Sequence, residues 1–294
     1  MKRVPAFLVI FVAAIGIVVL MRPRPRSVAA DAKPLLCYVG GTMTPVFDTL
    51  AVAYRQATGR EVEISSADSG ELLATIEMRL QGDLYVAHDP FMDVAMRRGL
   101  GVNAWRLGEL YPVLVVRKGN PKNIRSLGDL MRSDVRVYLT DYRYSTLGQI
   151  LPILFKRAGL DFAEFNRIKQ VPTHRSGAWA ANQVVLGTAD VALVWQVVAF
   201  LRRDTLDAIS LGDDVLPRHG VDAVTSATGR QYFVAPVKVA VVSLACSKQP
   251  RVIEEFLSFV TSEQGRRIFR EGGFEVSGYY GRREYINGVR QPDP

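Results

Sequence analysis

The sequence is poor in the residues that bind metals or build disulfide frameworks. Among 294 residues it has only two cysteines and three histidines. Cys37 and Cys246 lie far apart, and His88, His174 and His219 are scattered, so no spacing typical of a zinc site occurs. We therefore predict no metal site. The cysteines are compatible with one disulfide in an oxidising compartment or with two small buried side chains, and the sequence leaves both open.

The first thirty residues contain no acidic side chain, and this explains most of the formal charge of +8. Five of the 37 basic residues lie there, so 32 basic residues stand against 29 acidic ones from Asp31 onward. Such a small excess does not form a polybasic face, and we predict no nucleic-acid partner. The apolar share of 48% and the charged share of 22% are those of a globular protein.

Only one apolar run is long enough to cross a membrane. It extends from Val4 to Met21 and follows Lys2 and Arg3. Residues 1–30 therefore form either a cleaved signal peptide or a retained membrane anchor made by residues 4–21. The small residues "VAA" favour cleavage, whereas the arginines of "RPRPR" disfavour it. Both alternatives place the rest of the chain in the periplasm or otherwise outside the cytoplasm.

From Leu35 onward, short apolar runs alternate with amphipathic helical patterns, which is typical of an α/β fold. Two longer runs, "RLGELYPVLVVRKGNP" and "YFVAPVKVAVVSLACS", are expected as strands by which the chain crosses between two α/β units. The sequence predicts a first lobe from residues 34–115 and 238–294, and a second from residues 116–237. "RIKQV" is expected as a strand and the residues after Phe274 as a polar tail. A ligand cleft between two such lobes is expected, because α/β sheets present their strand-to-helix loops at one edge.

Four turns between a strand and a helix share one design. "GGTM" places Thr42 at an expected helix N-cap, and "SADSGE" places Ser69 just before a helix. In the second unit, "DYRYSTLG" and "THRSGAW" place Thr146, Leu147 and Gly177 at helix starts. A helix N-terminus carries about half a positive charge and N–H groups without intrahelical partners, so several together can bind an anion. Ordinary capping by Ser or Thr explains any single turn, and four turns in two halves favour an anion site.

The chain from Leu36 to about Phe274 resembles the periplasmic molybdate-binding proteins of ABC transporters, within the type II periplasmic-binding-protein superfamily. "YVGGTM" and "ADSG" correspond to that family's two serine-bearing turns, "GDLYVAHD" to its third strand, and "TLGQILPILFKRAGL" to a helix that begins at a ligand position. "GAWAANQVVLGTADVALVW" and "SEQGRRIFREGGF" correspond to later elements. The resemblance implies the two-lobed type II fold and these ligand-binding residues: Thr42, Ser69, Thr146, Leu147, Gly177 and Trp195.

The resemblance also implies a function. It indicates an extracytoplasmic solute-binding protein, not an enzyme, that captures a tetrahedral oxyanion, molybdate or tungstate, without a cofactor or catalytic residue. Its partners are then a membrane permease and its ATPase, and the protein itself is expected to be a monomer. Two alternatives stay open, namely the same fold with phosphate, sulfate or another anion as ligand, and a membrane-anchored anion sensor without a transport role.

Three positions depart from the family pattern. Threonine stands for serine at Thr42, and Trp195 stands where the family has a ligand tyrosine. Asp68 occupies a place where glycine is usual, and a carboxylate there repels a dianion if it faces the cleft. A carboxylate directed inward could instead accept a hydrogen bond from a protonated oxyanion such as hydrogen phosphate, and the sequence leaves its direction open.

Other chemistry-bearing residues support no competing site. His88 and Asp89 are adjacent in sequence and are expected to be turn residues instead of a catalytic pair. Tyr279 and Tyr280 lie beyond the last predicted helix, where no iron site is expected. Two arginines beside the second-lobe turns could add a positive field to the cleft or be solvated: Arg143 and Arg175.

Overall fold

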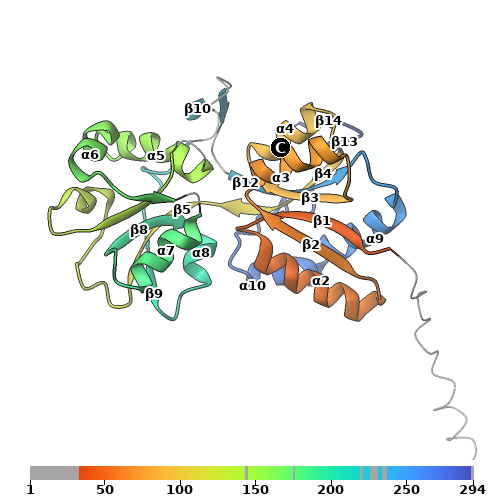
Figure 1. Ribbon diagram of the computed structural model, residues 1–294, viewed down its shortest axis with the longest axis horizontal. Helices are drawn as coiled ribbons and strands as arrows, with labels where there is room; N and C mark the ends of the chain where they lie inside the picture. Colours follow the sequence, from red (N-terminus) through yellow and green to blue (C-terminus); the bar gives the residue numbers. More distant parts are fainter. Residues whose placement is uncertain are drawn as a thin grey trace, which may run out of the picture.

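The structure is a computed structural model, and it describes residues 33–142, 145–174, 176–218, 221–225, 231–233 and 237–292. The expected targeting segment 1–30, Arg143, Arg175 and His219 lie outside the described residues. Two lobes lie side by side, each built on its own sheet (Figure 1). The described part of the chain contains no helix that is both long and apolar enough to span a membrane.

The first lobe is built on a seven-stranded mixed sheet with the order β14-β13-β4-β12-β3-β1-β2. β1 runs parallel to β2 and β3, whereas β12 runs antiparallel to β3 and β4. The strands are β1 (Leu35–Gly40), β2 (Val62–Ala67), β3 (Leu84–His88), β4 (Gly101–Leu110), β12 (Val237–Leu244), β13 (Arg283–Ile286) and β14 (Val289–Arg290).

Helices cover both faces of this sheet because its central strands are apolar on both sides. Leu35, Cys37 and Val39 of β1 pack in one core with α2, α9 and α10, while Tyr38 and Tyr85 pack in another with α3 and α4. The helices are α2 (Thr44–Thr58), α3 (Ser69–Arg79), α4 (Phe91–Arg97), α9 (Pro250–Val260) and α10 (Glu263–Glu271). Cys37 is buried, Cys246 is partly buried, and both are free thiols.

The second lobe is built on a five-stranded sheet with the order β7-β6-β8-β5-β9. β6 runs parallel to β7 and β8, and β5 runs antiparallel to β8 and β9. Its strands are β5 (Pro112–Arg117), β6 (Val137–Thr140), β7 (Thr173–His174), β8 (Val191–Trp195) and β9 (Leu206–Ser210). Its helices are the 3-10 helix η1 (Leu127–Met131), α5 (Thr146–Arg157), α6 (Phe162–Lys169), α7 (Gly177–Val185) and α8 (Gln196–Phe200). A separate hairpin joins β10 (Ala223–Thr225) and β11 (Gln231–Phe233).

The chain passes from the first sheet to the second at Tyr111. The expected single long strand is two strands here, since β4 ends at Leu110 and β5 begins at Pro112. The Gln196 side chain explains the break, because its Oε1 accepts the N–H of Tyr111 at 2.9 Å and its Nε2 donates to the Glu109 carbonyl at 2.8 Å. β12 belongs wholly to the first sheet. The lobe bounds expected at residues 115/116 and 237/238 stay a prediction.

Two expected elements differ from the structure. "RIKQV" is not a strand, because α6 continues to Lys169 once Asp161 caps it by accepting the N–H groups of Ala163 and Glu164. The C-terminal residues are not a polar tail. They form β13 and β14, and β13 pairs with β4 at the edge of the first sheet.

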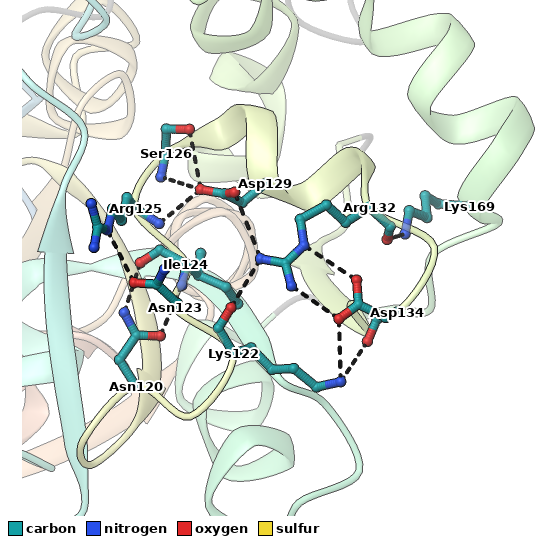
Figure 2. Close-up of polar contacts among 10 residues, drawn as sticks. All are labelled: Asn120, Lys122, Asn123, Ile124, Arg125, Ser126, Asp129, Arg132, Asp134 and Lys169. Carbon is teal, nitrogen blue, oxygen red and sulfur yellow. Dashed lines mark hydrogen bonds and ion pairs between the residues drawn. The ribbon is translucent and has the colours of Figure 1, made fainter.

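Hydrogen bonds and ion pairs connect residues within the basic loop between β5 and β6 (Figure 2). Asp134 accepts hydrogen bonds from Arg132 at 2.9 Å and from Lys122 at 3.4 Å. Asp129 caps η1 by accepting the backbone N–H groups of Arg125 at 2.8 Å and Ser126 at 3.0 Å, and these bonds lower the pKa of its carboxyl.

Candidate functional site

A cavity of about 390 Å³ lies between the two lobes. The first lobe supplies its wall from the β1–α2 turn, the start of α3, and the β3–α4 connection. The second lobe supplies the starts of α5 and α7, the end of β6, and the residues from β8 through α8. The lining residues are Gly41, Thr42, Pro45, Asp68, His88, Phe91, Thr140, Ser145, Thr146, Leu147, Ser176, Gly177, Ala178, Trp195, Val198, Leu201 and Arg202.

Thr42 lines the cavity, but it does not cap α2 as the sequence predicts. The helix begins at Thr44, its N-cap is Met43, and no side chain caps it. The turn is held by backbone bonds instead, from Met43 N–H to the Gly40 carbonyl at 2.8 Å and from Gly41 N–H to the Ala67 carbonyl at 3.0 Å. Among the described residues, the Thr42 hydroxyl has no hydrogen-bond partner, so it is available to a ligand.

The start of α3 presents Asp68 to the cavity, whereas Ser69 is turned inward. Asp68 is the N-cap, and its Oδ1 accepts the N–H of Gly70 at 3.0 Å. Ser69 is the first helical residue and is only 4% exposed. Its hydroxyl packs against Gly40, where an added Cβ would lie 2.4 Å from Ser69 Oγ. The structure therefore brings Asp68 to the cavity wall and leaves Ser69 out of the lining.

The start of α5 lies at the boundary between the lobes. Ser145 caps the helix by accepting the N–H of Gly148 at 3.2 Å, which leaves the N–H groups of Thr146 and Leu147 without intrahelical partners. Both residues line the cavity. The Thr146 hydroxyl donates to the Asp89 carbonyl of the first lobe at 3.4 Å. One hydroxyl expected to bind ligand thus already bridges the two lobes.

The start of α7 is built in the same way as that of α5. Ser176 caps it by accepting the N–H of Trp179 at 3.3 Å, and the Ser176 N–H in turn donates to His174 Nδ1 at 3.0 Å. Gly177 and Ala178 are the first two helical residues, and both line the cavity. An added Cβ at Gly177 would have no neighbour closer than 3.9 Å. This helix end therefore offers two N–H groups to an open space.

The sequence did not indicate the lining residues Thr140, Arg202 and Phe91. Thr140 ends β6, is 1% exposed, and its hydroxyl has no partner within the described structure. Arg202 is half-buried and donates to Asn182 Oδ1 at 3.0 Å and to the Ala178 carbonyl at 3.3 Å. Phe91 begins α4. A hydroxyl at the carboxyl end of a strand beside a helix start could have indicated Thr140, whereas no local pattern indicates Arg202.

His88 and Trp195 meet between the lobes, with ring centroids 6.3 Å apart. Burial lowers the pKa of His88 and so favours a neutral ring at pH 7, while the bond that its Nδ1–H donates to the Asp89 carbonyl at 2.9 Å acts in the opposite direction. Desolvation raises the pKa of Asp89 to about 7, and its Oδ2 accepts the N–H of Lys238 at 2.9 Å. The two adjacent side chains contact different partners. The expectation of two turn residues holds for Asp89 only, because His88 is the last residue of β3.

Comparison with known proteins identifies the family. A family model described as bacterial extracellular solute-binding protein matches residues 35–275. The molybdate-binding protein ModA of Mycobacterium tuberculosis is 24% identical over 256 residues, which cover 85% of this chain and 87% of the relative.

Two solved structures show the same fold. The periplasmic molybdate-binding protein of Azotobacter vinelandii aligns with a TM-score of 0.62 at 16% identity, over 83% of this chain and 99% of that one. PEB3 of Campylobacter jejuni, solved with L-phospholactate, aligns with a TM-score of 0.63 at 17% identity, over 83% of this chain and 100% of that one. These similarities confirm the two-lobed periplasmic-binding-protein fold. Because the family model spans most of the chain, the protein belongs to the bacterial extracellular solute-binding proteins.

Proposed function

We propose that this protein captures a small oxyanion in the cavity between its lobes and delivers it to the permease and ATPase of an ABC transporter. One observation carries the proposal. The N-termini of α5 and α7 both open into one cavity, and the buried Thr140 hydroxyl beside them has no partner among the described residues. Two helix ends of this kind concentrate partial positive charge and unpaired N–H groups at one place.

Neutral donors suit the capture and release of an anion. Hydrogen bonds to an ionised group are about twice as strong as neutral ones, so a few N–H and O–H groups suffice. A buried ammonium group would cost more to desolvate than these neutral groups do. Thr42 from the first lobe and the N–H groups of Leu147 and Gly177 from the second are the proposed ligands, with the Trp195 indole on the wall. Closure of the lobes around the anion would bring these two sets together.

Molybdate or tungstate is the first candidate ligand. It is the ligand implied by the sequence resemblance, and two of the similar proteins are molybdate-binding proteins by name. A second candidate is phosphate or an organic anion, which the position of Asp68 on the cavity wall favours. The extracytoplasmic location of the family agrees with the expected targeting segment 1–30, for which both alternatives, a cleaved signal peptide and a retained anchor, stay open.

Gly177→Pro should weaken anion binding about tenfold to a hundredfold, because proline removes one N–H that we assign to the ligand and such charge-assisted bonds contribute about 1.5–3 kcal/mol. Proline is well tolerated at the first residue of a helix, and the extended Ser176 before it suits proline (ψ 122°). Thermal-shift titration of the full-length protein in mild detergent, with molybdate, tungstate, sulfate and phosphate, measures the effect. Saturating ligand stabilises wild type by about 2.7 kcal/mol at a hundredfold excess over Kd.

Two controls separate the lost N–H from other effects of proline. Gly177→Ala keeps the N–H and adds a methyl group to the same wall. Glu263→Pro places proline at the first residue of α10, which lies outside the cavity lining and follows an extended N-cap, Ser262. Both should bind within about threefold of wild type. Absence of a shift with every oxyanion in wild type would refute the proposed function.

Thr140→Val should raise the stability of the ligand-free protein by about 1 kcal/mol and weaken anion binding about tenfold. Valine has nearly the shape of threonine, and it removes a buried hydroxyl that costs about 1–3 kcal/mol when unpaired. The same hydroxyl would donate to a bound anion, so stability and affinity change in opposite directions. Urea denaturation without ligand and titration calorimetry with ligand measure the two quantities. Unchanged affinity would show that Thr140 is only a core residue.

A further inference from the structure

The polar groups of the cavity are distributed unequally between the two lobes. The second lobe presents donors, namely the N–H groups at the starts of α5 and α7 and the Thr140 hydroxyl, and Arg202 also lines the cavity. The first lobe presents the Asp68 carboxylate beside Thr42 and His88. Since His88 is neutral, no positive side chain of the first lobe that lines the described cavity compensates Asp68.

Asp68 makes the N-terminus of α3 unfavourable for an anion, whereas a helix N-terminus usually attracts one. Its Oδ1 takes up the N–H of Gly70, which would otherwise be free for an anion. Ser69, whose hydroxyl could have donated to a ligand, is packed against Gly40. The N-terminus of α3 therefore presents an exposed carboxylate to the cavity, and the second oxygen of this carboxylate can still accept a hydrogen bond. An anion without a proton has only acceptor atoms, so the second carboxylate oxygen of Asp68 would repel it.

The size of the cavity admits more than a bare oxyanion. Its volume is about 390 Å³ before any closure of the lobes, which leaves room for an anion larger than a bare oxyanion. Phe91 from the first lobe and Trp195 and Val198 from the second give the remaining wall an apolar surface. Sites of this size and lining typically hold small organic molecules.

We propose that the natural ligand is an anion that brings its own hydrogen-bond donor. Its anionic head lies on the N-termini of α5 and α7, and its donor faces the carboxylate of Asp68. This inference rests on the proposed anion capture and deepens it, because it makes Asp68 the residue that decides ligand class. Two kinds of molecule combine an anionic head with a donor. One is a protonated inorganic oxyanion such as hydrogen phosphate, and the other is an organic acid that carries a hydroxyl or ammonium group.

The test compares Asp68→Asn with wild type by titration calorimetry of the full-length protein. The donor-bearing probes are inorganic phosphate, L-lactate and L-serine, and the donor-free probes are sulfate and molybdate. Asparagine caps helices as well as aspartate does, so the start of α3 is retained while the charge is removed. We expect Asp68→Asn to lower the affinity for the donor-bearing probe that binds wild type about tenfold or more. The same substitution should raise the affinity for sulfate or molybdate by a similar factor.

Asp161→Asn is the matched control. Asp161 caps α6 with the same kind of bond, to Ala163 N–H at 2.7 Å, is exposed, and lies outside the cavity lining. The substitution Asp161→Asn should leave the affinity for every probe unchanged. If Asp68→Asn folds poorly, Asp68→Ser keeps a capping oxygen and removes the charge by another route.

The outcomes separate this inference from the proposed function. Binding of phosphate alone among the donor-bearing probes supports the inference with an inorganic source, and binding of L-lactate or L-serine supports it with an organic source. If wild type binds molybdate or sulfate best and Asp68→Asn does not change the order, the inference is wrong and the proposed function stands. If no probe binds wild type, both are wrong.

Discussion

Glu284→Ala should lower the free energy of unfolding by about 3–5 kcal/mol, because it removes the buried carboxylate that two buried positive side chains share. Glu284 is 3% exposed on β13 and lies 3.5 Å from Lys238 Nζ and 3.7 Å from Arg106 Nη1. Arg106 and Lys238 are themselves buried, on the neighbouring strands β4 and β12. Arg106 retains a close ion pair with Glu109, but its buried Nε has no partner in the described structure.

Urea denaturation measures this effect, and Glu254→Ala is the matched control. Glu254 also pairs with an arginine, at 3.9 Å from Arg283, but its side chain is 52% exposed. Exposed pairs contribute about 0–1 kcal/mol, so the control should change stability little. Equal effects of the two substitutions would contradict the buried network. Glu284→Gln keeps an acceptor and loses the charge, so its loss of unfolding free energy should lie between those of Glu284→Ala and Glu254→Ala.

This network gives the C-terminal hairpin a structural role. β13 and β14 follow residue 275, where the match to the family model ends, and they extend the first sheet at its edge. The Tyr285 hydroxyl donates to Asp93 Oδ1 of α4 at 2.8 Å, which fixes the hairpin against a helix as well. Because β4 leads directly into the crossing at Tyr111, we expect loss of Glu284 to loosen the connection between the lobes.

Gly148→Ala should destabilise the protein by about 3 kcal/mol and weaken anion binding, because the added methyl group collides with backbone. A Cβ at Gly148 would lie 2.3 Å from the Asp141 carbonyl oxygen and 2.7 Å from Tyr142 Cα. Backbone cannot rotate away as a side chain can, so the first turn of α5 must shift. That turn carries the N–H group of Leu147, which we assign to the ligand.

The measurements are thermal unfolding and calorimetric titration with the anion that binds wild type. Gly128→Ala provides the control, since the nearest atom to a Cβ there is Ser126 Oγ at 3.4 Å, an ordinary contact. Alanine is also the better helix former, so this variant should be as stable as wild type or slightly more stable. A stable Gly148→Ala protein with normal affinity would show that the first turn of α5 does not position the ligand.

Local sequence predicted the elements whose determinants are themselves local. The helix starts at Ser145 and Ser176 follow from side chains that cap N–H groups three residues further on, and both lie where the turns indicated. The same local reasoning was wrong for Thr42, because the backbone closes that turn and no side-chain cap is needed. Ser69, which was expected just before a helix, is the first residue of α3, and Asp68 is the N-cap.

The sequence alone determined the alternation of strands and helices, the two-lobed α/β class and the four turns, because apolar periodicity and turn chemistry act over a few residues. Only the tertiary structure decided which residues of those turns line the cavity, as it placed Asp68 on the cavity wall and packed Ser69 against Gly40. It also brought Thr140, Arg202 and Phe91 into the lining and buried Glu284 between Arg106 and Lys238. These placements depend on the packing of strands and helices that are distant in sequence, and no local pattern encodes that packing.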